Sequence, residues 1–386
     1  MHDTSFKYPH KSTRELKALL FLFRLISRRF VVHTSLYIWR FLKIIRFPTK
    51  LLIGFTGYEQ FCAGQDVASC SFVSKKLAMH KVFSVLDYAN EHAKSAIDYD
   101  HNTSVVLETI EAAKNNSTYP FTVVKPSAIG PFELYQKKGS LIKLSDEEEP
   151  IWNSIHQRFE LLMHKASNSA VILMIDAEES WIQDGVDILL MPLLKKYNKN
   201  KVVVVVTIQL YLKGRNLVYK NLLKDADENG YILGVKLVRG AYMEKERKRA
   251  SALKINNPIC ESKHTTDEQY RDALQHALKT LHKHFCIVAT HNPSDIKWVV
   301  DYCVKNNVPI SSKNLWFSQL YGMRDYISFS LAKQGANVFK YVPFGPLKQA
   351  IPYLIRRALE NSAMKTQTLQ ECLMLKKEIQ RRKFND

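Results

Sequence analysis

Residues 201–209 read KVVVVVTIQ, and the five consecutive valines at 202–206 are typical of a strand buried on both faces. A strand of that kind belongs to a parallel sheet covered by helices on both sides, because only such a sheet leaves neither face in water. The segment therefore favours an α/β fold.

Short runs rich in Val, Ile and Phe lie on both sides of this strand, separated by longer stretches of helical period. Eight strands at this spacing fill about the length that a (β/α)₈ barrel needs. An open doubly wound sheet is the alternative, but it usually carries a GxGxxG or P-loop motif, and the 13 glycines form neither. We therefore predict a distorted (β/α)₈ barrel with an N-terminal helical extension. The candidate strands are residues 82–86, 121–125, 170–176, 201–209, 232–238, 285–290, 315–320 and 338–342.

Composition narrows the class of protein. Hydrophobic residues make up 46% of the 386, which is enough for a large core and excludes a wholly disordered chain. Lys and Arg number 56 against 37 Asp and Glu, and the net charge of +19 favours an anionic partner such as a nucleic acid, an acidic lipid or an anionic small molecule. The six cysteines include no CxxC, so we expect buried thiols rather than a disulfide scaffold, and no metal site.

The N-terminal region has a distinctive charge pattern. No Asp or Glu occurs from Leu16 to Tyr58, and basic residues are interleaved with apolar ones at near-helical spacing. Three interpretations remain open: binding to an anionic membrane surface, a mitochondrial transit peptide, and a pair of helices that pack on the main domain. Its longest apolar run, residues 30–39, is too short to span a bilayer. The apolar stripes are Leu20, Phe23, Leu25 and Ile26, then Ile38, Phe41, Leu42 and Ile45, and the basic residues are Lys17, Arg24, Arg28, Arg29, Arg40, Lys43, Arg46 and Lys50.

Polar residues follow most of the predicted strands. A barrel enzyme carries its chemistry at the carboxyl ends of its strands, so these residues taken together favour an active site. They include Lys125, Asp176, Gln209, Arg239, Thr290, His291, Gln319 and Tyr341.

The helix after the eighth strand supplies a possible anion clamp. We expect it to begin at Pro352, because proline suits the first helical position. Tyr353, Arg356, Arg357 and Glu360 then share one face, and two arginines near a helix N-terminus suit a carboxylate or phosphate. The alternative is an exposed Arg–Glu pair of little energetic consequence.

Several of these segments resemble proline dehydrogenases. The resemblance covers about residues 60–365 and follows the order of the family. Its most specific parts are VKLVRGAY at 235–242 and YLIRRALEN at 353–361. The remaining parts are KPSA at 125–128, DAE at 176–178, ATHN at 289–292, QLYGM at 319–323 and YVP at 341–343.

The resemblance implies an FAD enzyme that oxidises L-proline to 1-pyrroline-5-carboxylate, the first step of proline catabolism to glutamate. Hydride passes from proline C5 to flavin N5, and the electrons go to a membrane quinone. It also implies a location peripheral to the inner membrane in a bacterium, or at the mitochondrial inner membrane or matrix in a eukaryote. With no space after residue 365 for an aldehyde dehydrogenase domain, we expect the monofunctional form.

The resemblance assigns roles to individual positions. Asp176 and Lys236 resemble the catalytic pair, Asp176 on the substrate side and Lys236 near flavin N5. The substrate-binding positions are Lys125, Leu320, Tyr341, Tyr353, Arg356 and Arg357, and the cofactor-binding positions are Ala177, Gln209, Lys236, Gly240, Ala241, Tyr242, Thr290, His291 and Glu360.

Three single positions and one segment depart from the pattern or tune it. Lys236 replaces an Arg found in some members, which loses a planar bidentate contact. Met243 stands where an aromatic residue can stack on the cofactor, and FCAGQ at 61–65 replaces FCGGE. Tyr341 favours proline, because members that act on hydroxyproline are expected to have a smaller residue there.

Two other functions are alternatives. One is a flavin oxidoreductase of a related imino acid such as hydroxyproline. The other is a basic membrane- or nucleic-acid-binding protein on an inert barrel. No nucleic-acid motif supports nucleic-acid binding, and we expect no nucleic-acid partner. We divide the chain into a basic N-terminal region at 1–80, a catalytic barrel at 81–365 and a C-terminal helix at 366–386. A loop at 137–150, with its acidic run at 146–149, either closes over the site or is solvated surface.

Overall fold

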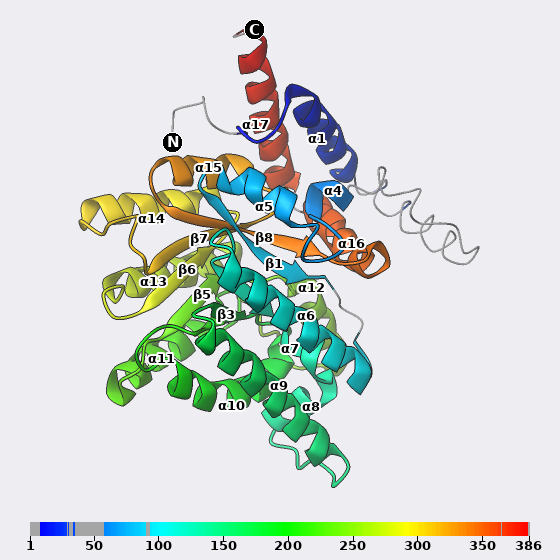
Figure 1. Ribbon diagram of the computed structural model, residues 1–386, viewed down its shortest axis with the longest axis vertical. Helices are drawn as coiled ribbons and strands as arrows, with labels where there is room; N and C mark the ends of the chain where they lie inside the picture. Colours follow the sequence, from blue (N-terminus) through cyan, green and yellow to red (C-terminus); the bar gives the residue numbers. More distant parts are fainter. Residues whose placement is uncertain are drawn as a thin grey trace. The chain divides into compact units, whose positions relative to one another are not determined.

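The computed structural model describes residues 8–28, 30, 34, 58–89, 93–363 and 365–384, with backbone alone at 348, 352, 360–363 and 365–367. Its eight strands form one sheet in the order β1-β8-β7-β6-β5-β4-β3-β2, and helices separate the strands along the chain (Figure 1). The predicted (β/α)₈ barrel is confirmed, with β1 and β2 at the two ends of the strand order. The strands are β1 (Val82–Tyr88), β2 (Phe121–Val124), β3 (Ile172–Ile175), β4 (Val204–Gln209), β5 (Gly234–Val238), β6 (Phe285–Ala289), β7 (Leu315–Leu320) and β8 (Asn337–Phe344).

Helices occupy the segments between the strands and both ends of the described chain. Before β1 come α1 (Thr13–Ile26), α4 (Tyr58–Phe61) and α5 (Ser71–Ala78). Between β1 and β8 lie α6 (Ala96–Asn115), α7 (Pro126–Ile129), α8 (Phe132–Gly139), α9 (Glu148–Asn168), α10 (Ser180–Tyr197), α11 (Arg215–Asn229), α12 (Met243–Leu253), α13 (Lys263–Lys279), α14 (Pro293–Lys305) and α15 (Asp325–Lys333). After β8 come α16 (Leu347–Ala363) and α17 (Lys365–Lys383).

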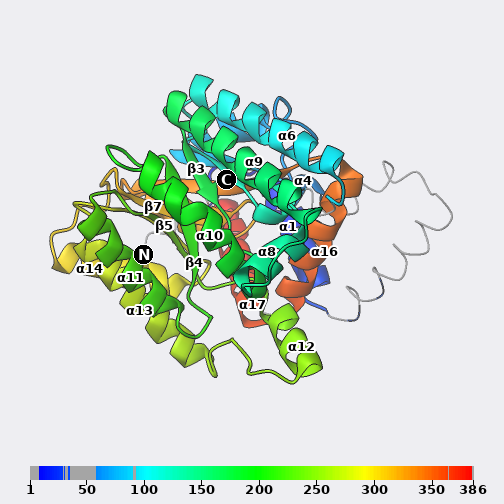
Figure 2. The ribbon, with the colours of Figure 1, turned by 90° about the horizontal axis from the view of Figure 1, so that it is seen from below.

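The chain divides into two compact units, which are described separately below. Unit 1 comprises residues 1–91, 319–334 and 340–386, and unit 2 comprises residues 92–318 and 335–339. In unit 2, α6 packs on α9, and α11 packs on α13 (Figure 2). In unit 1, α1 packs along α17 (Figure 1).

The strand of consecutive valines is buried throughout, as predicted, but it begins at Val204 rather than at residue 201. The reason is Asn198, whose fully buried side chain accepts from the backbone N–H groups of Val203 and Val204. Its amide also donates to the carbonyls of Val204 and Ile232. A side chain that satisfies these backbone groups holds the first valines in the turn before the strand.

The third strand also begins later than predicted. Ala170 has φ +54, and the N–H of Val171 donates to the carbonyl of Ala166, so these residues close the end of α9. A run of apolar residues cannot reveal this boundary, because hydrophobicity is the same in the strand and in the turn that enters it.

Two predictions about helix boundaries were wrong. Helix α16 begins at Leu347, so Pro352 is its sixth residue and Arg356 its tenth. The argument from the helix N-terminus therefore does not apply to the two arginines. The predicted loop at 137–150 is also shorter, because α8 ends at Gly139 and α9 begins at Glu148.

The acidic run at 146–149, which extends into the first turn of α9, pairs with α8. Glu148 binds Lys137, and the carboxylate of Glu149 lies 3.1 Å from Lys138 Nζ. Glu148 also accepts from the backbone N–H of Ser145 at 3.0 Å. These acidic side chains thus fix the ends of two helices.

Helix α1 confirms part of the predicted amphipathic region. Ser12 and Glu15 form a capping box at its start, and its buried residues are Leu16, Leu19 and Phe23. Leu25, expected on the apolar stripe, is exposed instead. The second expected stripe, at residues 38–45, lies outside the described residues.

All six cysteines are free and buried, as predicted. Among the described residues, no helix is long and apolar enough to cross a membrane.

Candidate active site

Strands β2, β3 and β5 bring three charged side chains together in unit 2. Lys125 and Asp176 follow the last residues of β2 and β3, and Lys236 is the third residue of β5. Lys236 Nζ donates to Asp176 Oδ1, and Lys125 Nζ lies 3.8 Å from Asp176 Oδ2. We call Lys125, Asp176 and Lys236 the Asp176 cluster. Strand register explains it, because Val124 pairs with Ile175, so that Lys125 and Asp176 follow their strands side by side.

Lys236 is buried inside the sheet, where an uncompensated ammonium group would cost several kcal/mol. Its position opposite Thr207 places it within reach of Asp176, whose carboxylate supplies the opposite charge. Gln209 ends the adjacent strand β4 and is also buried. Ala177, which follows Asp176, is partly buried.

Glu178 is a buried acid beside this cluster. It accepts from the backbone N–H of Ser127 at 2.8 Å and from the Ser127 hydroxyl at 2.7 Å. Burial raises the pKa of Glu178 to about 7, although the hydrogen bonds from Ser127 oppose the rise. The pKa of Glu178 therefore places the loss of its proton near neutral pH, next to the Asp176 cluster.

Helix α12 is fixed to the start of α10 by a second carboxylate. Glu246 accepts from the backbone N–H and the hydroxyl of Ser180, at 2.6 and 2.7 Å. An acid at this place satisfies an N–H that has no partner within its own helix. Lys245 of α12 also binds Glu179, at 2.5 Å.

The residues after β6 form a polar network with Arg239. The Arg239 guanidinium donates to Asp295 at 2.8 and 3.0 Å, and it lies 2.5 Å from Asp267. Thr290 donates to Asp295 at 3.4 Å and accepts from the N–H of Asn292 at 3.1 Å. The Asn292 side-chain Nδ2 is buried and has no hydrogen-bond partner among the described residues. Its neighbour His291 is partly buried.

Gly240, the second residue after β5, leaves no room for a side chain. Gly240 has φ +142, and a Cβ there would lie 2.2 Å from the Tyr211 ring, so only glycine fits. Ala241 is exposed, and Tyr242 is buried with Lys245 Nζ 5.3 Å from its ring centroid.

In unit 1, α16 carries the predicted arginine pair. Tyr353 and Arg357 are buried one turn apart, and the Arg357 guanidinium lies 5.3 Å from the Tyr353 ring centroid. Tyr353 packs in a core cluster that includes Tyr58 and Ile351. Arg356 is partly buried.

Leu320 and Tyr341 also belong to unit 1. Leu320 ends β7 and is partly buried, whereas Tyr341 is buried in β8. The N–H of Tyr321 donates to the carbonyl of Tyr341 at 2.8 Å. This backbone bond links Tyr341 to the residue that follows Leu320.

The structure thus groups many predicted residues within each unit. The side chain of Glu360 lies outside the described residues. The sequence analysis gave Ser127 and Asn292 only as members of the KPSA and ATHN segments. It missed Glu246 altogether, because the bond of Glu246 to Ser180 joins segments 66 residues apart and leaves no spacing signal. Glu178 could have been found, since it belongs to the DAE segment at 176–178.

Comparison with known proteins identifies the family. A family model described as proline dehydrogenase matches residues 72–370. The carbapenem antibiotics biosynthesis protein CarD of Pectobacterium carotovorum subsp. carotovorum is 30% identical over 324 residues, 83% of each chain. Proline dehydrogenase 1, mitochondrial, of Dictyostelium discoideum is 30% identical over 99% of this chain and 75% of its own. The human protein of that name is 35% identical over 63% of this chain and 41% of its own.

Solved structures show the same fold. Proline utilization A (PutA) from Bdellovibrio bacteriovorus, inactivated by N-propargylglycine, superposes with a TM-score of 0.70 at 22% identity. The match covers 81% of this chain and 33% of that chain, so this chain spans about a third of the PutA chain. The chain therefore belongs to the proline dehydrogenase family of oxidoreductases.

Proposed function

We propose that the chain oxidises L-proline to 1-pyrroline-5-carboxylate with FAD, by hydride transfer from proline C5 to flavin N5, as the first step toward glutamate. The observation that carries this proposal is the Asp176 cluster, in which the buried Lys236 of β5 and the lysine that follows β2 hold the carboxylate that follows β3. Such a cluster fixes charge and orientation at the place where barrel enzymes bind their substrates.

The residues of unit 2 suit a flavin. Asn292 offers a buried N–H donor with no described partner, and Gly240 exposes backbone where no side chain fits. A bound flavin supplies the hydride acceptor. Lys236 contributes positive charge that stabilises a developing anion. The residues proposed to hold FAD are Ala177, Gln209, Lys236, Gly240, Ala241, Tyr242, Thr290, His291 and Glu360.

The substrate carboxylate is assigned to Arg356, Arg357 and Lys125, since guanidinium groups bind a carboxylate through two parallel hydrogen bonds. Tyr341, Tyr353 and Leu320 are assigned to the proline ring. Asp176 orients the substrate side of the site, because two ammonium groups already occupy its oxygens.

The test is the visible absorption spectrum of the purified protein, recorded without oxygen before and after addition of L-proline. We expect a flavin band that bleaches with L-proline and much less with hydroxyproline. A flavin band that does not bleach with L-proline contradicts the substrate, and a protein that neither contains nor takes up FAD contradicts the cofactor.

Hydroxyproline is the second candidate substrate. The buried Tyr341 favours proline, because the ring hydroxyl of hydroxyproline needs space beside it. We expect Tyr341→Ser to raise the ratio of hydroxyproline to proline turnover. An unchanged ratio removes Tyr341 as the specificity residue.

We also propose that a membrane quinone accepts the electrons and that the N-terminal region binds anionic lipid. Helix α1 supports the second point, because Phe21 and Leu25 are exposed one turn apart beside the exposed Lys17, Arg24 and Arg28. We accordingly propose that the protein lies at the inner membrane in a bacterium, and at the mitochondrial inner membrane or in the matrix in a eukaryote.

Sedimentation with vesicles tests the lipid proposal. We expect the full chain to bind vesicles that contain anionic lipid, and to bind less at high salt. Phe21→Ser with Leu25→Ser should weaken binding. A full chain that stays in the supernatant with anionic vesicles contradicts the proposal.

A further inference from the structure

The turn between β7 and α15, residues 320–325, is held by a buried lysine of unit 1. Lys340 Nζ donates to the carbonyl of Met323 at 2.6 Å and of Leu320 at 3.4 Å, and it lies 2.9 Å from Asp325 Oδ1. Lys340 is fully buried. One side chain thus binds both ends of the turn.

Lys340 is adjacent to Tyr341 in β8, and neighbouring strand residues point to opposite faces. Lys340 faces α15, so Tyr341 faces the other side of the strand. Together with the bond from Tyr321 N–H to the Tyr341 carbonyl, this fixes the turn to β8 through main chain and side chain.

The N-terminal segment Tyr8–Lys11 reaches the same turn at two points. His10 Nε2 lies 3.1 Å from Asp325 Oδ2, and its ring stacks on Phe329 with centroids 4.5 Å apart. We call His10, Asp325 and Lys340 the Asp325 cluster. Burial would raise the pKa of Asp325, but Lys340 and His10 outweigh burial and hold that pKa well below its usual value.

The second point runs through Gln60. Lys11 Nζ donates to Gln60 Oε1 at 3.2 Å, and Gln60 Nε2 donates to the Gly322 carbonyl at 3.1 Å. Gly322 has φ +75, and a Cβ there would lie 2.1 Å from the Gln60 carbonyl oxygen. The contact between Gln60 and the turn is therefore so close that only glycine fits at position 322.

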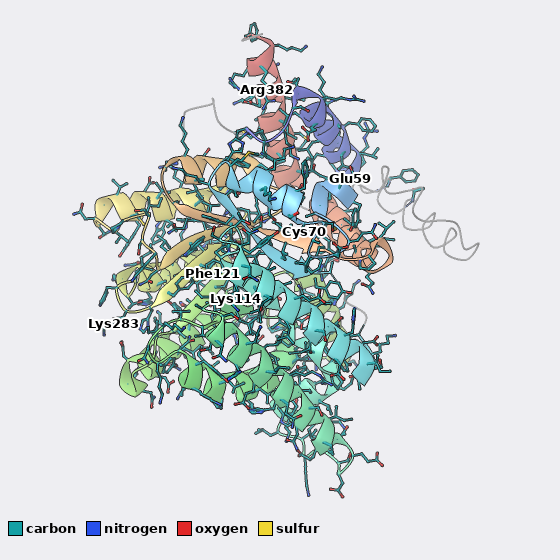
Figure 3. The ribbon with its side chains drawn as sticks, viewed as in Figure 1. Glu59, Cys70, Lys114, Phe121, Lys283 and Arg382 are labelled. Atoms are coloured by element: carbon teal, nitrogen blue, oxygen red, sulfur yellow. The ribbon has the colours of Figure 1, made fainter. Side chains whose placement is uncertain are left out.

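Helix α17 holds the N-terminal segment Tyr8–Lys11 in place. Arg382, labelled in Figure 3, donates to the carbonyls of Tyr8 and Lys11 at 2.8 and 2.7 Å. Tyr8 donates to Glu371 at 3.2 Å, and Glu371 lies 3.5 Å from Arg324. Arg324 is buried at φ +55, a conformation that costs energy for a residue with a side chain.

So many buried charges do not serve stability best, because well-packed apolar side chains of similar size are often as stable or more so. In some proteins buried charges select one conformation of the chain, and here Lys340 contacts both ends of the turn. The turn begins at Leu320 and is bonded to Tyr341, the two residues assigned above to the proline ring.

We propose that the segment Tyr8–Lys11, braced by α17, positions Leu320 and Tyr341 for proline binding through Asp325, Lys340 and Gln60. His10, Lys11, Asp325 and Lys340 are positioning residues that do not touch the substrate. The inference rests on the proposed function through the assignment of Leu320 and Tyr341 to the substrate ring.

Steady-state kinetics of the full-length holoenzyme with L-proline tests this inference. In Lys11→Met and His10→Gln, we expect KM for proline to rise roughly fivefold to tenfold while kcat stays within about twofold, because a misplaced binding group weakens binding before chemistry. Lys11→Arg keeps the donor to Gln60 and should return KM to within about twofold of the wild type. Lys297→Met, which removes a lysine of the exposed pair with Asp301, is the matched control and should change neither constant.

Two outcomes overturn the inference. One is an unchanged KM in both Lys11→Met and His10→Gln. The other is a parallel loss of kcat and folded protein without a change in KM, which describes a purely structural role. If one variant does not fold, the other decides, and Lys11→Arg supplies the rescue.

Leu320→Ala separates this inference from the proposed function. An increased KM in Lys11→Met with an unchanged KM in Leu320→Ala keeps the positioning role and removes Leu320 from the substrate site. An increased KM in Leu320→Ala alone keeps the substrate site and removes the positioning role.

Discussion

The Asp176 cluster and the Asp325 cluster consist of similar residue types but serve different purposes. Each places one aspartate between two basic side chains that come from segments far apart in the sequence. The side chains of Lys125, Asp176 and Lys236 are 14%, 17% and 5% exposed, whereas those of His10, Asp325 and Lys340 are 4%, 3% and 0% exposed. Residual exposure lets a cluster exchange contacts with a ligand, whereas a sealed cluster can only hold the surrounding chain. Residue type alone therefore does not distinguish binding from positioning.

Asp325→Asn should have the largest effect. The substitution leaves the buried Lys340 without its counter-charge, and breaking a buried pair costs about 3–5 kcal/mol of unfolding free energy. Asp176→Asn is the matched comparison. It also removes a counter-charge from a buried lysine, Lys236, but it should cost less, because the Asp176 side chain is 17% exposed against 3% for Asp325. Urea unfolding of both variants measures the difference, and equal losses would show that burial does not separate the clusters.

Glu178→Gln tests the acid beside the Asp176 cluster through pH. The pKa of Glu178 is about 7 in the folded chain against about 4.5 when exposed, so the folded state holds an extra proton between these values. The free energy of unfolding of the wild type should therefore fall, by at most about 3 kcal/mol, as pH rises from about 4.5 through 7.

Glutamine does not titrate, so the variant should lack this fall, and its stability relative to the wild type should increase with pH. Urea unfolding at a series of pH values measures the difference. Parallel curves for the two proteins would mean that Glu178 keeps its ordinary pKa.

Lys236→Met sharpens the comparison through activity. If Lys236 stabilises charge that develops on the cofactor, its loss should lower kcat roughly 100-fold, equivalent to about 2.7 kcal/mol of barrier. Lys340→Met removes the corresponding lysine of the Asp325 cluster and should act chiefly on KM. Anaerobic single-turnover rates with L-proline distinguish the two, and a larger loss of kcat in Lys340→Met would reverse the assignment.

Lys297→Met sets the lower limit of the comparison. Lys297 and Asp301 are one turn apart in α14, with Lys297 Nζ 2.6 Å from Asp301 Oδ2, and both side chains are mostly exposed. Such pairs contribute about 0.3–0.5 kcal/mol, so the melting temperature should hardly move. A loss as large as that of Asp325→Asn would contradict the importance given to burial.

The strands of the barrel could be predicted because their apolar runs are long and bounded by polar residues. Their first residues could not, since Asn198 and Ala170 decide them through hydrogen bonds and backbone conformation. The start of α16 was missed for a similar reason. Proline is favourable at a first helical position, but residues 347–351 already form the helix before it.

The candidate site shows the same division. Lys125, Asp176 and Lys236 were predicted because each belongs to a segment with a specific family pattern. Glu246 and the Asp325 cluster belong to no local pattern, and their partners lie 66 residues away for Glu246 and more than 300 for His10.

The sequence alone determined the alternation of strands and helices, the family, and the residue types available at the strand ends. These follow from local periodicity and from motifs, both of which are properties of neighbouring residues. Only the tertiary structure decided which of two similar lysine–aspartate clusters keeps contact with solvent and which is sealed. That distinction depends on burial, and burial is set by segments such as Tyr8–Lys11 and α17 that come from the two ends of the chain.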